Sequence, residues 1–131
     1  MQLWERAGAS AVLYEKGNEA LEAGDFPTAI EFLESFSRVS PSEPHAHYLL
    51  AYAYYRVGNP GRAVAQAQAA IRLDRGRNLG YRCMLAWIYE MTGDTRRAYE
   101  EYLAILHVSP GHAQAREGLL RVENALKEER E

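Results

Sequence analysis

Apolar residues recur along this chain at steps of three and four residues, the period of an α-helix that packs one face against a core. The pattern fills six stretches that come in pairs around short polar turns: residues 13–23, 29–39, 48–57, 63–73, 81–91 and 98–108. A seventh stretch, 113–131, carries an apolar stripe of Ala115, Leu119, Val122 and Leu126 opposite a charged face. The pattern therefore predicts an all-helical chain.

The turns between the paired stretches repeat at a nearly constant interval. Gly24, Gly58 and Gly93 stand 34 and 35 residues apart, and each is followed by Asp or Asn. Glycine permits a tight reversal, and Asp or Asn caps the helix that follows. Five residues after each glycine comes an alanine, whose small side chain lets paired helices approach closely. These markers predict three helix–turn–helix units.

The repeat markers resemble those of the tetratricopeptide repeat (TPR), a helix–turn–helix unit of 34 residues. The matching positions, more often alike in size and polarity than identical, are Gly17, Ala20, Ala29, Leu33, Phe36, Pro41, Leu50, Ala51, Tyr54, Ala63, Ala67, Ala70, Leu85, Ala86, Tyr89, Ala98, Tyr102, Ile105 and Pro110. The resemblance implies an all-α, right-handed α-solenoid. The second unit departs from the pattern because Arg75 replaces the proline, so we expect a looser exit turn with Gly76 just after the helix.

We expect one TPR domain over residues 1–131, with the following parts: an N-terminal extension 1–9, repeats 10–43, 44–78 and 79–112, and a capping helix 113–131. An array needs such a polar-backed helix to shield its last unit, so we expect it to end there. Residues 1–9 allow two predictions. Either the first helix extends backwards with Trp4 and Ala7 on its stripe, or Gly8 and Ser10 break it and Ser10 caps the true start.

Composition narrows the possible partners. A formal net charge of -3 argues against nucleic acid as a partner, and no apolar run approaches the roughly 20 residues that span a membrane. The 47% hydrophobic content excludes a disordered chain. Cys83 is the single cysteine and cannot form an internal disulfide, which fits a reducing compartment. We therefore expect a soluble, cytoplasmic protein.

Motifs for catalysis are missing from the sequence. It has no Gly-rich phosphate loop, no HExxH and no GxSxG motif. His45 and His47 are two residues apart on a predicted helix, so their side chains point apart and cannot share a metal. Cys83 has no histidine near it in sequence and is expected to be an inert thiol. We predict no enzyme, no cofactor and no metal site.

The informative surface is a predicted groove. In TPR arrays the first helices of successive units line a concave face, and by that resemblance the groove residues are Tyr14, Asn18, Tyr48, Leu49, Tyr52, Tyr55, Arg56, Met84, Trp87 and Met91. We interpret the aromatic residues as surplus to the core, and an exposed apolar patch usually marks a binding site. We expect them to hold a segment of a partner protein, extended or helical, with Asn18 and Arg56 as polar anchors. The alternative is that these side chains are half-buried in a small solenoid or covered by the N-terminal segment.

The known ligand mode of the family can be tested position by position. Its chaperone-binding members grip a C-terminal carboxylate through five basic and amide residues. Only Asn18 matches here, because the other four positions hold Tyr14, Leu49, Gly80 and Met84. An Hsp70 or Hsp90 tail is therefore not the expected ligand. The apolar groove is instead similar to that of small bacterial three-repeat chaperones of secretion and assembly systems, an analogy of size and polarity that favours an adaptor or chaperone.

Charge suggests a second function. Residues 1–43 carry a net charge of -5, with Glu31 and Glu34 on the second helix, whereas residues 44–78 carry +4. Such polarity can steer a partner or drive head-to-tail self-association, or it can simply mark a solvated convex face, which is the interpretation we favour. The alternative function is therefore a structural scaffold, a homo-oligomer that assembles through its N-terminal helix, with Trp4, or through its charged faces.

Overall fold

The computed structural model describes residues 3–130, with side chains from Gly8 to Arg130. Within that range the chain forms seven helices and no strand: α1 (Leu3–Glu22), α2 (Phe26–Val39), α3 (Pro44–Arg56), α4 (Pro60–Asp74), α5 (Leu79–Met91), α6 (Thr95–Val108) and α7 (Ala113–Arg130). The predicted all-helical class is confirmed. The prediction that Gly8 and Ser10 break the first helix is wrong, since α1 runs through both. The predicted placement of the Trp4 and Ala7 side chains lies outside the described side chains.

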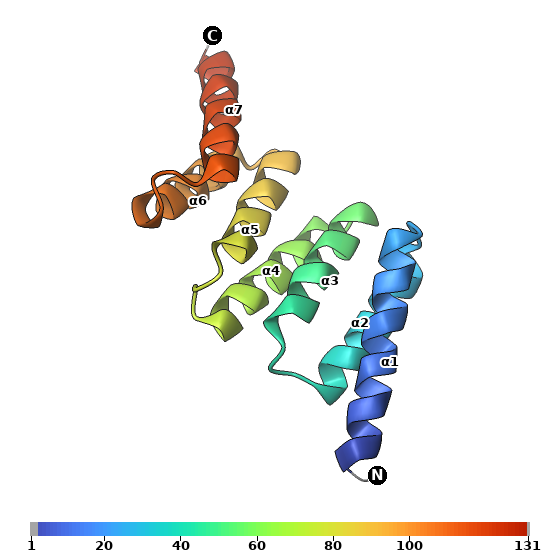
Figure 1. The fold of residues 1–131 in the computed structure, drawn as a ribbon. Coiled ribbons are helices and arrows are strands. Elements are labelled where there is room, and N and C mark those ends of the chain that lie inside the picture. Colours follow the sequence, from blue (N-terminus) through green and yellow to red (C-terminus); the bar gives the residue numbers. More distant parts are fainter. Residues whose placement is uncertain (1–2, 131) are drawn as a thin grey trace.

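The helices form a two-layer solenoid. Each helix packs against the next one along the chain, and α5 also contacts α3 and α7. Figure 1 shows α1, α3 and α5 side by side in one layer, with α2, α4 and α6 behind them and the two chain ends at opposite ends of the molecule. The fold is therefore the expected array of three helix pairs closed by a capping helix.

The turns within the pairs follow the sequence markers. Asp25, Asn59 and Asp94 cap α2, α4 and α6, each with a side-chain oxygen 3.2 or 3.3 Å from the backbone nitrogen three residues on. The glycine before each cap has a positive φ, from 77° to 87°, which glycine adopts without strain. The predicted looser exit of the second unit is confirmed as well: Arg75 has a φ of 57°, and Gly76 follows it at 71°.

Small residues set the spacing between the two layers. The alanines five residues after the turn glycines, Ala29, Ala63 and Ala98, are fully buried. Gly17 of α1 has the same role, because a Cβ there would stand 2.8 Å from the Leu33 side chain of α2. Between these contacts runs one apolar core whose largest fully buried members are Leu33, Leu50, Ile88, Tyr102, Ile105 and Val122.

The capping helix α7 is anchored at its start and along its inner face. The Nδ1 atom of His112 accepts the backbone N–H of Ala115 at 3.2 Å, which caps the helix. Ala115 and Val122 are buried, and Leu119 and Leu126 are half-buried against the core cluster. The predicted apolar stripe is therefore the face that packs on the last helix pair.

Candidate functional site

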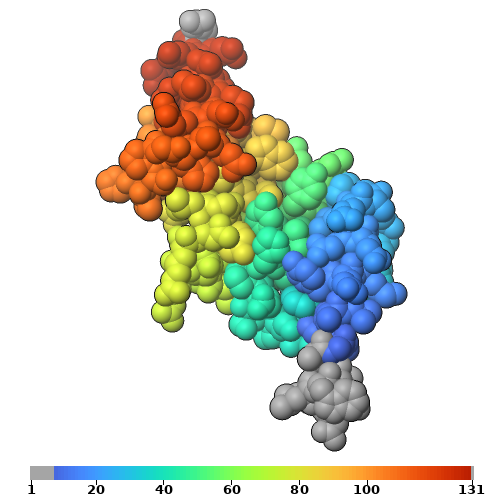
Figure 2. Space-filling model, in the orientation of Figure 1, coloured from blue at the N-terminus to red at the C-terminus, as the bar shows by residue number. Residues whose placement is uncertain are grey.

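Two adjoining cavities lie on the face formed by α1, α3, α5 and α7, which is turned toward the viewer in Figure 2. The first cavity, of about 420 Å³, is lined by Asn18, Leu21, Glu22, Tyr48, Leu49, Tyr52 and Met84. The second cavity, of about 280 Å³, is lined by Tyr48, Tyr52, Gly80, Cys83, Met84, Trp87, Tyr102, Gln114, Glu117 and Arg121. Tyr48, Tyr52 and Met84 line both cavities, so the two form one continuous surface, which we call the groove.

The structure brings together part of the predicted site. The predicted residues that line the groove are Asn18, Tyr48, Leu49, Tyr52, Met84 and Trp87. Tyr14 packs on the ring of Phe36 at 5.1 Å between ring centroids instead. Tyr55 lines neither cavity, but its ring packs edge-on against Trp87 at 4.7 Å between ring centroids. Met91 lines neither cavity, and 44% of its surface is exposed.

Arg56, the last of the predicted residues, is engaged inside the chain. Its guanidinium lies 4.6 Å from the centroid of the Phe26 ring, and its Nη1 donates to the Tyr52 hydroxyl at 2.7 Å. The ring of Tyr52 also stands edge-on to Phe26 at 5.9 Å. Arg56 therefore positions Tyr52, and its role as an anchor for a ligand stays a prediction.

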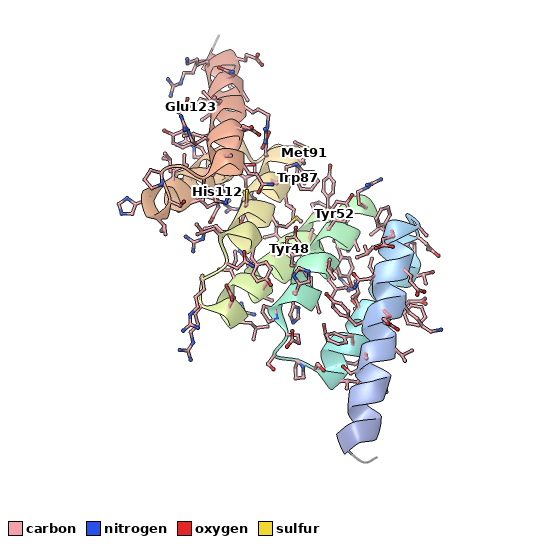
Figure 3. The ribbon with its side chains drawn as sticks, in the orientation of Figure 1. Tyr48, Tyr52, Trp87, Met91, His112 and Glu123 are labelled. Carbon is pink, nitrogen blue, oxygen red and sulfur yellow. The ribbon has the colours of Figure 1, made fainter. Side chains whose placement is uncertain are left out.

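The groove aromatics are fixed by their neighbours. Tyr48 stacks on His45 at 5.1 Å and meets the ring of Tyr81 at 5.4 Å. Tyr52 and Trp87 face each other at 6.4 Å, and Figure 3 shows them on adjacent helices, α3 and α5. Side chains that are already ordered lose little conformational entropy when a ligand binds. The rings are thus a preorganised apolar surface.

One wall of the second cavity was not predicted from the sequence. It consists of Tyr102 from α6 together with Gln114, Glu117 and Arg121 from α7. The sequence carries one signal for it: Gly118 lies in the middle of α7, and a glycine inside a helix often marks a close approach. A Cβ at Gly118 would stand 2.5 Å from a ring carbon of Tyr102.

A hydrogen-bond network on Glu90 ties this wall to α5. The Tyr102 hydroxyl donates to Oε1 of Glu90 at 2.8 Å, and Nε of Arg121 donates to Oε2 at 2.7 Å. A second Arg121 nitrogen donates to Oε1 at 3.1 Å. Burial, and then the hydrogen bond to Glu90, raise the pKa of Tyr102, while the hydrogen bond to Glu90 raises the pKa of Arg121. At neutral pH the Tyr102 phenol is therefore neutral and the Arg121 guanidinium is charged.

Two further groups in the lining of the second cavity, the Cys83 thiol and the Tyr48 phenol, are kept in their neutral forms. Burial raises the pKa of the Cys83 thiol, although nearby Arg121 opposes the shift, and burial likewise raises the pKa of Tyr48. Among the residues whose placement is described, no three His, Cys, Asp or Glu side chains gather as metal ligands. The same part of the chain has no helix with the length and hydropathy needed to cross a membrane.

Comparison with known proteins gives the family. The sequence model of the tetratricopeptide repeat matches residues 14–78, which include the first two helix pairs from Tyr14 onward. The chain is a TPR protein. No curated protein matches it at a significant level. TPR domains are protein-interaction modules, and this is the class of function that the family supports.

Solved TPR domains superpose on nearly the whole chain. The first TPR domain of Spaghetti (RPAP3), bound to an HSP90 peptide, has a TM-score of 0.81 and 22% identity over 92% of this chain and 97% of that one. The Arabidopsis OM64 TPR domain has a TM-score of 0.82 and 18% identity, covering 92% and 98%. The second TPR domain of human RPAP3, in complex with an HSP70 peptide, has a TM-score of 0.80 and 19% identity, covering 90% and 98%.

The expectation that the groove aromatics are surplus to the core is wrong for part of the set. Tyr14, Tyr55 and Trp87 of this TPR protein pack against the buried core cluster with one part of their surface. Trp87 still exposes another part to the second cavity. The reason is geometric: helices that alanines hold close together leave bulky side chains on the concave face only partly free of their neighbours.

The charged faces that suggested self-association are partly used within the TPR array. The Tyr54 hydroxyl donates to a carboxylate oxygen of Glu34, and Arg62 donates to the same hydroxyl at 3.4 Å. These contacts fasten α2 to α3 and α4. Glu31 and the arginines near the end of α4 remain exposed. The scaffold alternative stays a prediction.

Proposed function

We propose that this TPR protein is a non-catalytic interaction module that holds a segment of a partner protein in the groove, as an adaptor or chaperone acting in the cytoplasm. One observation carries the proposal: the two cavities meet at Tyr48, Tyr52 and Met84 and form a single surface, which is largely apolar on α1, α3 and α5 and polar on α7. A surface that crosses several helices suits a chain segment better than a compact small molecule.

The character of the groove supports recognition by burial of apolar groups. Aromatic rings and methionines offer large contact areas, and truncating such anchors typically costs more than 1 kcal/mol of binding free energy. The ordered state of Tyr48, Tyr52 and Trp87 lowers the entropic cost of binding. We infer that these three rings are the anchors.

The polar groups of the groove fit binding better than catalysis. Glu90 is occupied by Arg121 and Tyr102, so it is not free to act as a general base. The raised pKa of Cys83 keeps its thiol protonated, whereas a nucleophilic cysteine needs a lowered pKa. These groups set the shape and charge of the cavity.

Two of the solved TPR domains are bound to acidic peptides, one of HSP90 and one of HSP70. This groove differs from the carboxylate-gripping pattern in a specific way. Two positions that would hold clamp residues carry Leu49 and Met84, which line the first cavity as apolar side chains. Asn18 is the one match, and it lines the same cavity. We propose that the ligand is an apolar segment and not a chaperone tail.

The test is a selection of displayed random peptides on the purified protein, followed by fluorescence anisotropy with the enriched peptides. The Tyr52→Ala, Trp87→Ala double variant should bind them at least about tenfold more weakly, because each change removes an anchor. The matched control is Leu103→Ala, Leu120→Ala, which truncates two exposed side chains that line neither cavity. This control should bind normally.

Circular dichroism verifies that the variants are folded before their binding is compared. If the double variant unfolds, Tyr52→Ala alone replaces it, because Tyr52 is only half-buried. Equal binding by the wild type and the folded groove variant would reject the proposal. A molar mass that rises with concentration and that the groove variants do not change would favour the scaffold instead.

A further inference from the structure

The charge of the second cavity is decided by which of its ionised groups are already paired. Arg121 is the cation in its lining, and it donates two hydrogen bonds to Glu90. Glu90 is the more buried partner, with 12% of its side chain exposed. An anionic ligand group that binds Arg121 would have to displace the Glu90 carboxylate. That buried carboxylate would then lose the positive charge that compensates it. Arg121 is therefore a poor receptor for acidic residues.

Glu117 is the uncompensated charge of this cavity. It precedes Arg121 by one helical turn, a spacing that permits an ion pair, but the guanidinium is directed at Glu90. Within residues 8–130 Glu117 makes no salt bridge and no side-chain hydrogen bond. Glu22, in the lining of the first cavity, adds a second negative charge to the groove.

Aromatic rings form part of the lining of the second cavity beside Glu117. Tyr48, Tyr52 and Trp87 line it together with that carboxylate. Aromatic faces attract cations, Trp most strongly, and a carboxylate next to them adds a direct charge interaction. Met84 and Cys83 add apolar surface to the lining, which suits the aliphatic stem of a long basic side chain. The first cavity lacks Trp87 and is lined mainly by apolar groups, so it suits an aliphatic side chain.

We propose, on the basis of the function proposed above, that the groove selects segments in which a lysine or arginine enters the second cavity beside Glu117 while a neighbouring apolar side chain fills the first. The charge of this groove is thus opposite to that of a site for acidic tails. Charge complementarity supplies the specificity, and the apolar surface supplies most of the affinity.

The experiment compares three synthetic peptide libraries that are identical except at one fixed position, which holds Arg, Gln or Glu. The other positions are mixtures of apolar and small residues. The Arg library should bind the wild-type protein about three- to tenfold more tightly than the Gln library, and the Glu library most weakly. High salt should narrow these differences, because the charge interaction is partly exposed to solvent.

Variants on α7 test the assignment to Glu117. Glu117→Gln should remove most of the preference for Arg over Gln, and Glu117→Lys should reverse the order of the Arg and Glu libraries. The matched control is Glu123→Gln, which makes the same change on the same helix but at a side chain that lines a separate cavity between α6 and α7. This control should keep the wild-type preference. Glu117 is exposed, so its substitutions leave the fold intact.

The two proposals fail in different ways. If none of the three libraries binds, the proposed function itself is rejected. If the libraries bind and Tyr52→Ala weakens all three, but the Glu library binds as well as the Arg library, the groove proposal stands and the charge inference is overturned. The same holds if Glu117→Gln leaves the Arg preference unchanged.

Discussion

Gly118 of α7 has no room for a side chain, which makes it a sensitive test of how the capping helix docks. A Cβ added there would stand 2.5 and 2.7 Å from two ring carbons of Tyr102 and closer still to the ring Cζ. The ring cannot swing aside freely, because Tyr102 is 1% exposed and its hydroxyl donates to Glu90. Gly118→Ala must therefore displace α7 or break the network on Glu90.

Two opposing terms set the size of the effect. Overpacking a well-filled core costs about 1–3 kcal/mol, while replacing glycine by alanine inside a helix stabilises it by about 1 kcal/mol. Because the added Cβ would overlap a buried ring, we expect strain in the upper part of this range, about 2–3 kcal/mol, and therefore a net loss of about 1–2 kcal/mol in the free energy of unfolding. Because α7 carries Gln114, Glu117 and Arg121 into the second cavity, peptide binding should weaken as well.

Urea denaturation followed by circular dichroism measures this loss. The matched control is Gly8→Ala, the same substitution in helix α1 at a position where a Cβ would meet no atom within 4 Å. That variant should be slightly more stable than the wild type, because alanine raises the helix propensity and causes no steric overlap at this position. If Gly118→Ala matches the wild type or exceeds it in stability, the close contact between α7 and Tyr102 is refuted.

Two further predictions concern titratable groups of the groove. Because the pKa of Tyr102 is raised above its ordinary value of 10.0, the folded state favours the neutral phenol, so its contribution is complete below pH 10 and is lost as the pH rises above it. The free energy of unfolding should therefore fall above pH 10, and less steeply in Tyr102→Phe; identical slopes would contradict this. Cys83, whose pKa burial raises, should react with iodoacetamide much more slowly in the native protein than in urea, and more slowly again with peptide bound; a rate that peptide leaves unchanged would place the ligand elsewhere.

Local sequence signals determined the elements of this protein. The three glycine–cap pairs, the buried alanines after them and the helical periodicity predicted the turns and the helix pairs, because each of these features acts over a few neighbouring residues. Local signals could not decide whether the first helix extends through residues 1–9 or begins at Ser10. Gly8 lowers helix propensity, but the structure carries α1 through it, as tertiary packing of the rest of the helix outweighs a cost of about 1 kcal/mol.

The groove was only partly predictable, since its residues come from helices that are distant in sequence. The repeat register placed Tyr48, Tyr52 and Trp87 on one face, and the structure gathers them there. The repeat register did not show that Arg56 would pack on Phe26 or that Tyr14 would pack on Phe36. These contacts depend on side chains from other helices.

By itself, the sequence determined the family, the helix pairs and the aromatic character of the concave face. Each repeat carries the same types of residue at the same positions, and these local signals specify the same helix–turn–helix unit each time. Only the tertiary structure decided the wall formed by α7, where Gly118 lets the helix approach Tyr102 and Arg121 reaches Glu90. That contact joins residues 31 positions apart. Because Arg121 pairs with Glu90, Glu117 is left as the unpaired charge. Which of the two carboxylates Arg121 contacts depends on how α7 packs against α5.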